Sequence, residues 1–327
     1  MDNNAKLRPL YLAKILYERT DEDHYLTTMQ LAQILEEEYG IPAHRQTIKT
    51  DIELLQQFGM DIQEVKSTQN RYNLISRQFE IAELKLLIDA VQSSKFIPKE
   101  RSEQMVSKIV TLAGQHKAEE LKRNASVEGR VKSENRQGLL IVDAINEAIN
   151  ARKKIAFQYF AYNIRKQKKL RHDGKEYLIS PWALTWDEEN YYMIGYDSDE
   201  DKIKHYRVDK MTNLQPTEEK RDGAELFDNF DMALYSKQTF GMYGGREETV
   251  TLRCKNELAN VMIDKFGFDT AFSNITDTHF DMRVKVFVSP MFLTWLMNFG
   301  ADITVLFPES VKDELIELAS DVLEQYK

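Results

Sequence analysis

The spacing of apolar residues changes along the chain, and this change narrows the folds that the sequence can adopt. Through residues 1–150, apolar side chains recur every three or four positions, as in helices that bury one face. Through 151–220 they alternate with polar residues, as in short strands. Through 246–327, stretches with the strand spacing alternate with stretches that have the helical spacing. Over a chain of 327 residues, this pattern predicts an α+β protein of several domains rather than a single core.

Residues 1–75 are predicted to form three helices followed by a hairpin. The stretch from Thr27 to Gln30 has the spacing of a capping box at the start of the second helix, and Gly40 ends that helix. Extended runs at 62–66 and 71–74 flank a polar turn. The three helices are expected to bury these apolar faces: Leu12, Ile15 and Leu16; Leu31, Ile34, Leu35 and Tyr39; Ile48, Ile52 and Leu55.

The third of these helices carries the residues that we expect to bind DNA. Arg45 and Lys49 are four positions apart, and so are Gln46 and Thr50, which places all four on one face. A helix-turn-helix protein inserts such a face into the major groove. Arginine and glutamine then contact base edges, while lysine and threonine favour phosphates. With the helix start and the hairpin tip included, the predicted DNA-binding residues are His44, Arg45, Gln46, Thr47, Lys49, Thr50, Lys66 and Arg71.

The sequence does not decide between a DNA-binding surface and an ordinary solvated helix face, because both have this pattern of polar residues. The chain holds 53 acidic and 44 basic residues, and its net charge of −9 does not favour DNA binding. What matters is where the cations cluster. A second basic segment, interleaved with aromatic residues, suits either a nucleic-acid or phosphate surface or a solvated hairpin tip. Its cations are Arg152, Lys153, Lys154, Arg165, Lys166, Lys168, Lys169, Arg171 and Lys175, interrupted only by Asp173.

The rest of the chain divides into four further regions. Residues 117–137 are charged and sparse in apolar side chains, which predicts a connector or hinge. Ser289 followed by Pro290 predicts the start of a helix. The expected regions are a helical linker at 76–150, a small β-barrel at 151–220, an irregular linker at 221–245, and a βαββαβα unit close to a ferredoxin-like fold at 246–327.

Three stretches of the predicted barrel resemble a WYL domain. They are Ser180-Pro181-Trp182-Ala183-Leu184, the run from Asn190 to Asp197, and the run from His205 to Met211. The tripeptide for which the family is named stands here as Tyr191-Tyr192-Met193, so only its middle residue matches. The front of the chain resembles the DeoR-type winged helix-turn-helix that commonly precedes a WYL domain, and 246–327 resembles the extension that often follows it.

The resemblance implies a Sm-like or SH3-like barrel that senses a ligand, in some family members single-stranded nucleic acid or nucleotides. Arg207 and His205 are suited to clamp a phosphate, and tyrosines can stack on bases. The tyrosines also fit a plain aromatic core, and a buried Arg207 would need a partner, either Asp209 or a ligand. The family's polar cluster corresponds here to Tyr159, Ser180, Tyr192, His205 and Arg207.

We therefore expect a DNA-binding transcription regulator, a homodimer on double-stranded operator DNA, controlled by a ligand in the barrel. The expected ligand is a nucleic acid, a nucleotide or a similar phosphate-bearing molecule. Two alternatives stay open: a repressor of the same architecture that senses a metabolite, and an adaptor that binds nucleic acid through the barrel rather than through the N-terminal helices.

Several classes of protein have no support in the sequence. It contains no phosphate-binding loop, dinucleotide fingerprint, nucleophile elbow or zinc motif, so we expect no enzyme activity, catalytic residue, metal or cofactor. The sequence has no run of 18 apolar residues, so no membrane span is predicted. Residues 1–9 lack the apolar core of a signal peptide. The single cysteine, Cys254, is expected to be a buried strand residue, and a reduced, cytoplasmic setting fits it.

Overall fold

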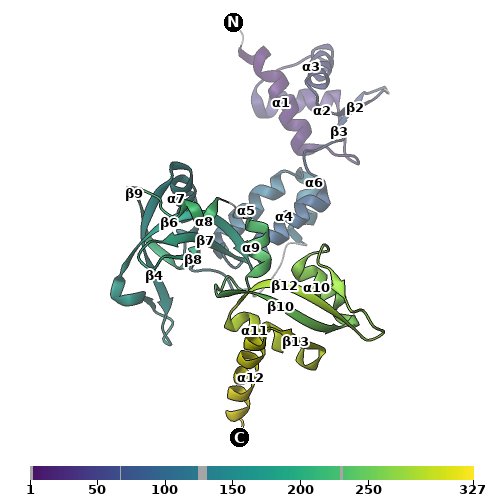
Figure 1. The fold of residues 1–327 in the computed structure, drawn as a ribbon. Helices are drawn as coiled ribbons and strands as arrows, with labels where there is room; N and C mark the ends of the chain where they lie inside the picture. Colours follow the sequence, from purple (N-terminus) through teal and green to yellow (C-terminus); the bar gives the residue numbers. More distant parts are fainter. Residues whose placement is uncertain (1–2, 67, 124–130, 229–230) are drawn as a thin grey trace. The chain divides into compact units, whose positions relative to one another are not determined.

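The computed structural model describes residues 3–66, 68–123, 131–228 and 231–327, which form two compact units (Figure 1). The units span Met1–Glu134 and Asn135–Lys327. Helices are combined with several antiparallel sheets, so the predicted mixture of α and β structure is confirmed. The boundary between the units falls inside the expected linker at 76–150. Among the described residues, no helix has the length and apolar character that crossing a membrane requires.

The N-terminal part of the first unit contains the three helices and the hairpin where the sequence predicts them. Thr27 caps the second helix in a full capping box with Gln30, and Gly40 follows it with a φ of 66°. A short strand before that helix adds a third strand to the hairpin, in the order β1-β3-β2. The elements are α1 (Asn3–Arg19), β1 (Leu26–Thr27), α2 (Thr28–Tyr39), α3 (Arg45–Gln57), β2 (Ile62–Val65) and β3 (Arg71–Leu74).

One apolar core holds these elements together. Leu12, Ile15 and Leu16 of α1 are fully buried, as the sequence predicts. Leu31 and Leu35 of α2 pack in the same cluster, which also takes in Tyr72 and Leu74 of β3. From α3, the cluster receives Ile48, Ile52 and Leu55.

The second part of this unit is helical, with its own small core around Leu84, Ile88 and Val110. The predicted connector at 117–137 is wrong in its first part, because α6 continues to Arg123 and buries Leu121. Residues 124–130 of that stretch lie outside the described residues. Beyond them, Lys132 Nζ donates to the carbonyls of Val91 and Ser94. The helices are α4 (Ile81–Ser93), α5 (Lys99–Thr111) and α6 (Gln115–Arg123).

The second unit begins with a helix, α7, that packs on a six-stranded antiparallel sheet. Strand β4 lies inside this sheet, pairing with β6 and β9, and at its far end with β5. Register shifts interrupt the β4–β9 and β6–β7 ladders, and such bulges let strands bend sharply. The elements are α7 (Gly138–Ala151), β4 (Lys153–Tyr162), β5 (Lys168–Leu170), β6 (Glu176–Asp187), β7 (Asn190–Asp197), β8 (Lys202–Arg207) and β9 (Met211–Lys220), with short 3₁₀ turns at Arg171–Gly174 and Val208–Lys210.

The segment 221–245 is not the irregular linker that the sequence suggests. It forms two short helices, α8 (Ala224–Phe227) and α9 (Met232–Gln238). Phe227 stacks on Trp182 of β6 with ring centroids 4.5 Å apart, and Tyr235 and Phe240 are buried. The two helices are only four and seven residues long, too short to be stable alone, so burial against tertiary partners orders the segment.

The last region has the predicted order of elements, βαββαβα, and forms a four-stranded antiparallel sheet ordered β11-β12-β10-β13. The alternating residues of β10 and β12 supply its core, and Cys254 is buried in β10 as expected. Ser289 Oγ caps α11, accepting from the Phe292 amide. The elements are β10 (Arg246–Lys255), α10 (Ala259–Phe266), β11 (Phe272–Ser273), β12 (His279–Val288), α11 (Pro290–Met297), β13 (Ile303–Phe307) and α12 (Glu309–Glu324), with 3₁₀ turns at Asn256–Leu258 and Gly300–Asp302.

Neighbouring leucines on α3 test which side of this helix is held by the core. Leu55 is 7% exposed and Leu54 is 50% exposed. Leu55→Ala should lower the free energy of unfolding by about 2–4 kcal/mol, since it leaves a cavity. Leu54→Ala should change it by less than about 0.5 kcal/mol. Urea unfolding followed by far-UV circular dichroism measures both, and equal losses would contradict this orientation of α3.

Candidate nucleic-acid interface and ligand site

The outer side of α3 leaves Arg45 and Gln46 exposed and Lys49 partly exposed. Burial of Ile48, Ile52 and Leu55 on the opposite side imposes this orientation. The acidic residue nearest in sequence on the outer side is Glu53, whose carboxylate lies 3.9 Å from Lys49 Nζ. An exposed pair of this length is weak, so Lys49 stays available to a phosphate.

A hollow of about 200 Å³ joins this helix face to the hairpin turn. Arg45, Gln46 and Lys49 form one wall, and Thr68 and Gln69 of the turn belong to the other. Thr28 and Met29, at the first turn of α2, also line it, whereas the acidic run at 36–38 lies at the far end of that helix. Three separate elements therefore present polar groups to one concave surface.

The other predicted DNA-binding residues differ in their exposure and in the contacts that they make within the protein. His44 and Lys66 are exposed, and Thr47 is half-buried. The Thr50 hydroxyl donates to the Gln46 carbonyl at 3.1 Å, so it is engaged with its own helix. The guanidinium of Arg71 lies over the ring of Tyr25, 4.3 Å from its centroid. This stacking holds Arg71 at the base of the hairpin turn.

In the second unit, Arg207 is the centre of the predicted ligand cluster. Its Nε and Nη2 donate to the two carboxylate oxygens of Asp209 at 3.0 and 2.9 Å, and Nη2 also donates to Asn190 Oδ1 at 2.8 Å. The Asp209 side chain is only 4% exposed, whereas that of Arg207 is 37% exposed, so the carboxylate is shielded from water and the guanidinium is partly open to it. Asp209 is thus the partner of a half-buried arginine.

Two tyrosines complete this cluster. The Arg207 amide donates to Tyr159 Oη at 3.1 Å, and Tyr192 lies directly across from Arg207 on β7. Burial raises the pKa of both tyrosines to about 12. Their phenols therefore stay protonated at neutral pH and keep an O–H group that can donate a hydrogen bond.

Ser180 and His205 are engaged elsewhere. Ser180 lies opposite Tyr196, and its Oγ accepts from the Asp222 amide at 2.8 Å. His205 Nε2 lies 2.9 Å from the hydroxyl of Tyr235 on α9. The fold therefore brings Tyr159, Tyr192 and Arg207 together. Ser180 and His205 interact instead with residues outside this group.

Two residues of this region escaped the sequence reasoning. Asn190 is the first residue of β7, and a side chain next to a tight turn gives no signal for a contact with an arginine 17 positions later. Tyr235 lies in the segment that was expected to be an irregular linker. No periodic pattern surrounds it that would indicate burial.

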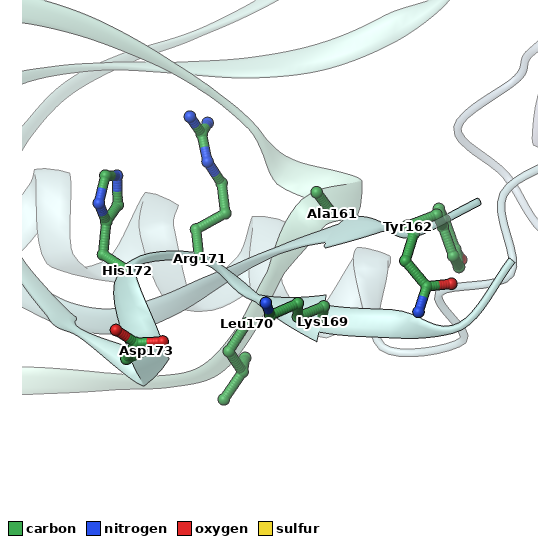
Figure 2. A pocket seen from close by; sticks show the side chains of 8 residues that line it. Ala161, Tyr162, Lys169, Leu170, Arg171, His172 and Asp173 are labelled. Atoms are coloured by element: carbon green, nitrogen blue, oxygen red, sulfur yellow. The ribbon is translucent and has the colours of Figure 1, made fainter. Parts of the chain in front are cut away.

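The basic segment at 152–175 divides into two parts. Lys153 Nζ pairs with Glu218 at 2.6 Å, and Lys154 Nζ pairs with Asp222 at 2.7 Å. These two lysines serve the fold of the sheet and are not free for a ligand. The cations from Arg165 onward lie on an exposed hairpin, beside a hollow of about 280 Å³ in which Arg171 and His172 extend to one side of the chain (Figure 2).

His205 gives the second unit a pH-dependent stability. Burial lowers its pKa from 6.5 to about 4. Between these values the unfolded chain takes up a proton that the folded protein does not, so stability falls as the pH falls. From pH 7 to pH 5, His205 should cost about 2 kcal/mol of the free energy of unfolding. His205→Gln keeps an acceptor for Tyr235 but does not titrate.

Urea unfolding of both proteins at the two pH values measures this effect. Other groups titrate equally in both, so the comparison isolates His205. The fall in stability should be smaller in His205→Gln by the stated amount. The same fall in both proteins would show that the ring is not shielded from protons.

Among solved structures, proteasome accessory factor B/C (PafBC) of Arthrobacter aurescens is similar at 16% identity with a TM-score of 0.30, over 99% of this chain and 49% of that one. The chain thus spans about half the length of that protein. A CRISPR Cas-related protein is similar at 13% identity with a TM-score of 0.25, over 99% of this chain and 83% of that one. Scores of this size do not show a shared arrangement. No curated protein matches the sequence.

Two protein-family models match the second unit. Residues 141–216 match the WYL domain, from the first turn of α7 into β9. Residues 246–323 match the WCX domain, from β10 to the end of α12. The predicted resemblance to a WYL domain with an extension behind it is thereby confirmed, while the DeoR-type assignment of the N-terminal part stays a prediction. The second unit is thus similar to a WYL domain followed by a WCX domain.

Proposed function

We propose that the protein is a transcription regulator that binds duplex DNA through α3 and the β2–β3 turn. The observation that carries this proposal is the concave surface where Arg45, Gln46 and Lys49 face Thr68 and Gln69. In a winged helix-turn-helix, the third helix enters the major groove while the hairpin follows the phosphates. The exposed guanidinium and amide on α3 are the groups that make bidentate contacts to guanine and adenine.

The WYL domain supplies the regulation in this proposal, through a Sm-like barrel that binds a phosphate-bearing ligand at Arg207. A phosphate can bind at the exposed part of the guanidinium, since Arg207 is 37% exposed and keeps N–H groups beyond those that bond to Asp209 and Asn190. The phenols of Tyr159 and Tyr192 stand ready as donors at the same place. Such a ligand regulates DNA binding only if it binds one conformation of the protein more tightly than another.

The same proposal assigns binding rather than catalysis to the protein, and a homodimer on DNA. At Arg207 the polar groups are paired with one another, and the two tyrosines are held protonated by burial. Neither arrangement provides an activated nucleophile. Two copies are expected because regulators of this type read two half-sites spaced by a turn of the duplex.

Removal of two cations from α3 tests the DNA-binding surface. Genomic fragments selected by the full-length protein provide the DNA, and fluorescence anisotropy at several salt concentrations measures the affinity. Arg45→Ala with Lys49→Ala should weaken binding at least tenfold and reduce the slope of log affinity against log salt by about 2. Lys108→Ala with Lys122→Ala removes the same charge from exposed positions on α5 and α6. Equal behaviour of the two double variants would overturn the proposal.

Substitution of Arg207 tests the ligand site. Calorimetric titration of the full-length protein with short single-stranded oligonucleotides, mononucleotides and inorganic phosphate identifies which probe binds. Arg207→Lys keeps the charge but loses the planar fork, and it should weaken the bound probe at least tenfold. Lys202→Gln, on the same strand and exposed, is the control. Undiminished affinity in Arg207→Lys would place the ligand elsewhere.

A further inference from the structure

The hairpin of β4 and β5 extends beyond the rest of its sheet as an arm with an unusual charge. We define the basic arm as residues 161–175, of which 161–173 are all exposed. At its tip, Ile164 is 101% exposed. The arm carries six lysine and arginine side chains and one acid, Asp173, for a net charge of +5 within a chain of net charge −9.

Hydrogen bonds within the tip hold the arm in one shape. Asn163 Oδ1 accepts from the amides of Arg165 and Gln167, each at 2.9 Å, and the Asn163 amide donates to the Gln167 carbonyl at 3.0 Å. Lys166 takes the left-handed conformation of the turn, with a φ of 60°. Because the tip is closed on itself, binding need not order it first.

Alternation along β5 places cations on both faces of this ribbon. Ala161 pairs with Lys169 and Tyr162 with Lys168, so the two lysines point to opposite sides. Lys169 and Arg171 both line the hollow beside the arm, Arg171 from the 3₁₀ turn that follows β5 (Figure 2). On the face opposite Lys169, Lys168 Nζ lies 4.7 Å from the centroid of the Phe160 ring.

None of the arm's six cations forms an ion pair within the part of the chain that the structure describes, although acids outnumber bases in the protein. By contrast, Lys153 and Lys154 at the base of β4 are both paired with carboxylates. Like charges crowded on one ribbon repel one another, a cost that a polyanion removes. The arm is therefore matched to a partner with regularly spaced negative charges.

Lysine side chains lie over two aromatic rings of the arm, and this arrangement favours a duplex over a single strand as the partner. Single strands bind by stacking their bases on exposed aromatic faces. Here Lys168 covers the ring of Phe160, and Lys210 Nζ lies over the ring of Tyr162, 4.5 Å from its centroid. Phe160 is buried, and Tyr162, which is 41% exposed, has a lysine over its ring, so the arm offers few free aromatic faces to bases.

We propose that the basic arm is a second DNA-binding element, a two-stranded ribbon that lies in a groove of the duplex with cations facing the phosphates on both sides. The major groove is wide enough for such a ribbon. The contacts are to phosphates, so they add affinity without sequence preference. The proposal rests on the proposed function in that DNA is the partner, but it uses residues of the second unit alone.

Neutralising the arm in the full-length protein tests the proposal on a duplex of arbitrary sequence. The triple variant Lys168→Gln, Lys169→Gln and Arg171→Gln should reduce the slope of log affinity against log salt by about 2 to 3. Its affinity should fall at least tenfold. A control with the same loss of charge is Lys202→Gln, Lys220→Gln and Arg283→Gln, at exposed positions on β8, β9 and β12. An arm variant that behaves like this control overturns the proposal.

Single-face variants separate a ribbon in a groove from a flat contact. Lys168→Gln changes one face, and Lys169→Gln changes the other. Both variants should reduce the slope of log affinity against log salt if the ribbon lies between two phosphate strands. If either variant leaves that slope unchanged, the groove geometry is overturned. Tighter binding of a single strand than of the duplex, lost in the arm variants, would overturn it as well.

The α3 variant Arg45→Ala with Lys49→Ala distinguishes this inference from the proposed function. Weakened binding in the α3 variant, with an unaffected arm variant, overturns the arm and leaves the proposed function standing. Weakened binding in the arm variant, with an unaffected α3 variant, supports the arm and overturns the role of α3.

Discussion

The packing of α3 onto α1 and α2 is the constraint on which the proposed DNA-binding surface depends. Ile48, Ile52 and Leu55 enter one core with residues from both helices, and this leaves α3 no freedom to rotate about its axis. Burial of three aliphatic side chains contributes several kcal/mol, roughly 1.5–3 for each, far more than any exposed charge on the other side. The polar face can therefore be selected for DNA without cost to the fold.

The cluster around Arg207 is connected through β8 and α9 to the C-terminal sheet. Arg207 and His205 lie two positions apart on β8, hence on the same side of the strand. His205 meets Tyr235 of α9, and the Tyr235 ring lies 5.2 Å from that of Phe287 on β12. A ligand bound at Arg207 would act on a strand that is already fastened to α9. This offers a physical route from the proposed ligand site to the C-terminal sheet.

Local patterns predicted much of the fold because their causes are local. The capping box of Thr27 and Gln30, and the Ser289 cap before Pro290, are each formed within four residues, and both lie where the sequence places them. Strict alternation in β10 and β12 likewise predicted a sheet that is buried on one face. The segment 221–245 and the helix α6 escaped prediction, because their order comes from a few buried side chains that meet partners far along the chain.

The sequence by itself determined the order of elements in 1–75 and 246–327, the inward faces of the helices in 1–75 and the likeness to a WYL domain, since periodicity and short motifs carry that information. Only the tertiary structure decided which charges are free. Lys154 and Lys169 belong to one basic segment, yet Asp222 pairs with the first, while no carboxylate among the described residues forms an ion pair with the second. Arg207 similarly acquires Asn190 and Asp209 through strand pairing and a turn. Electrostatic partners are chosen by distance in space, which a linear pattern does not encode.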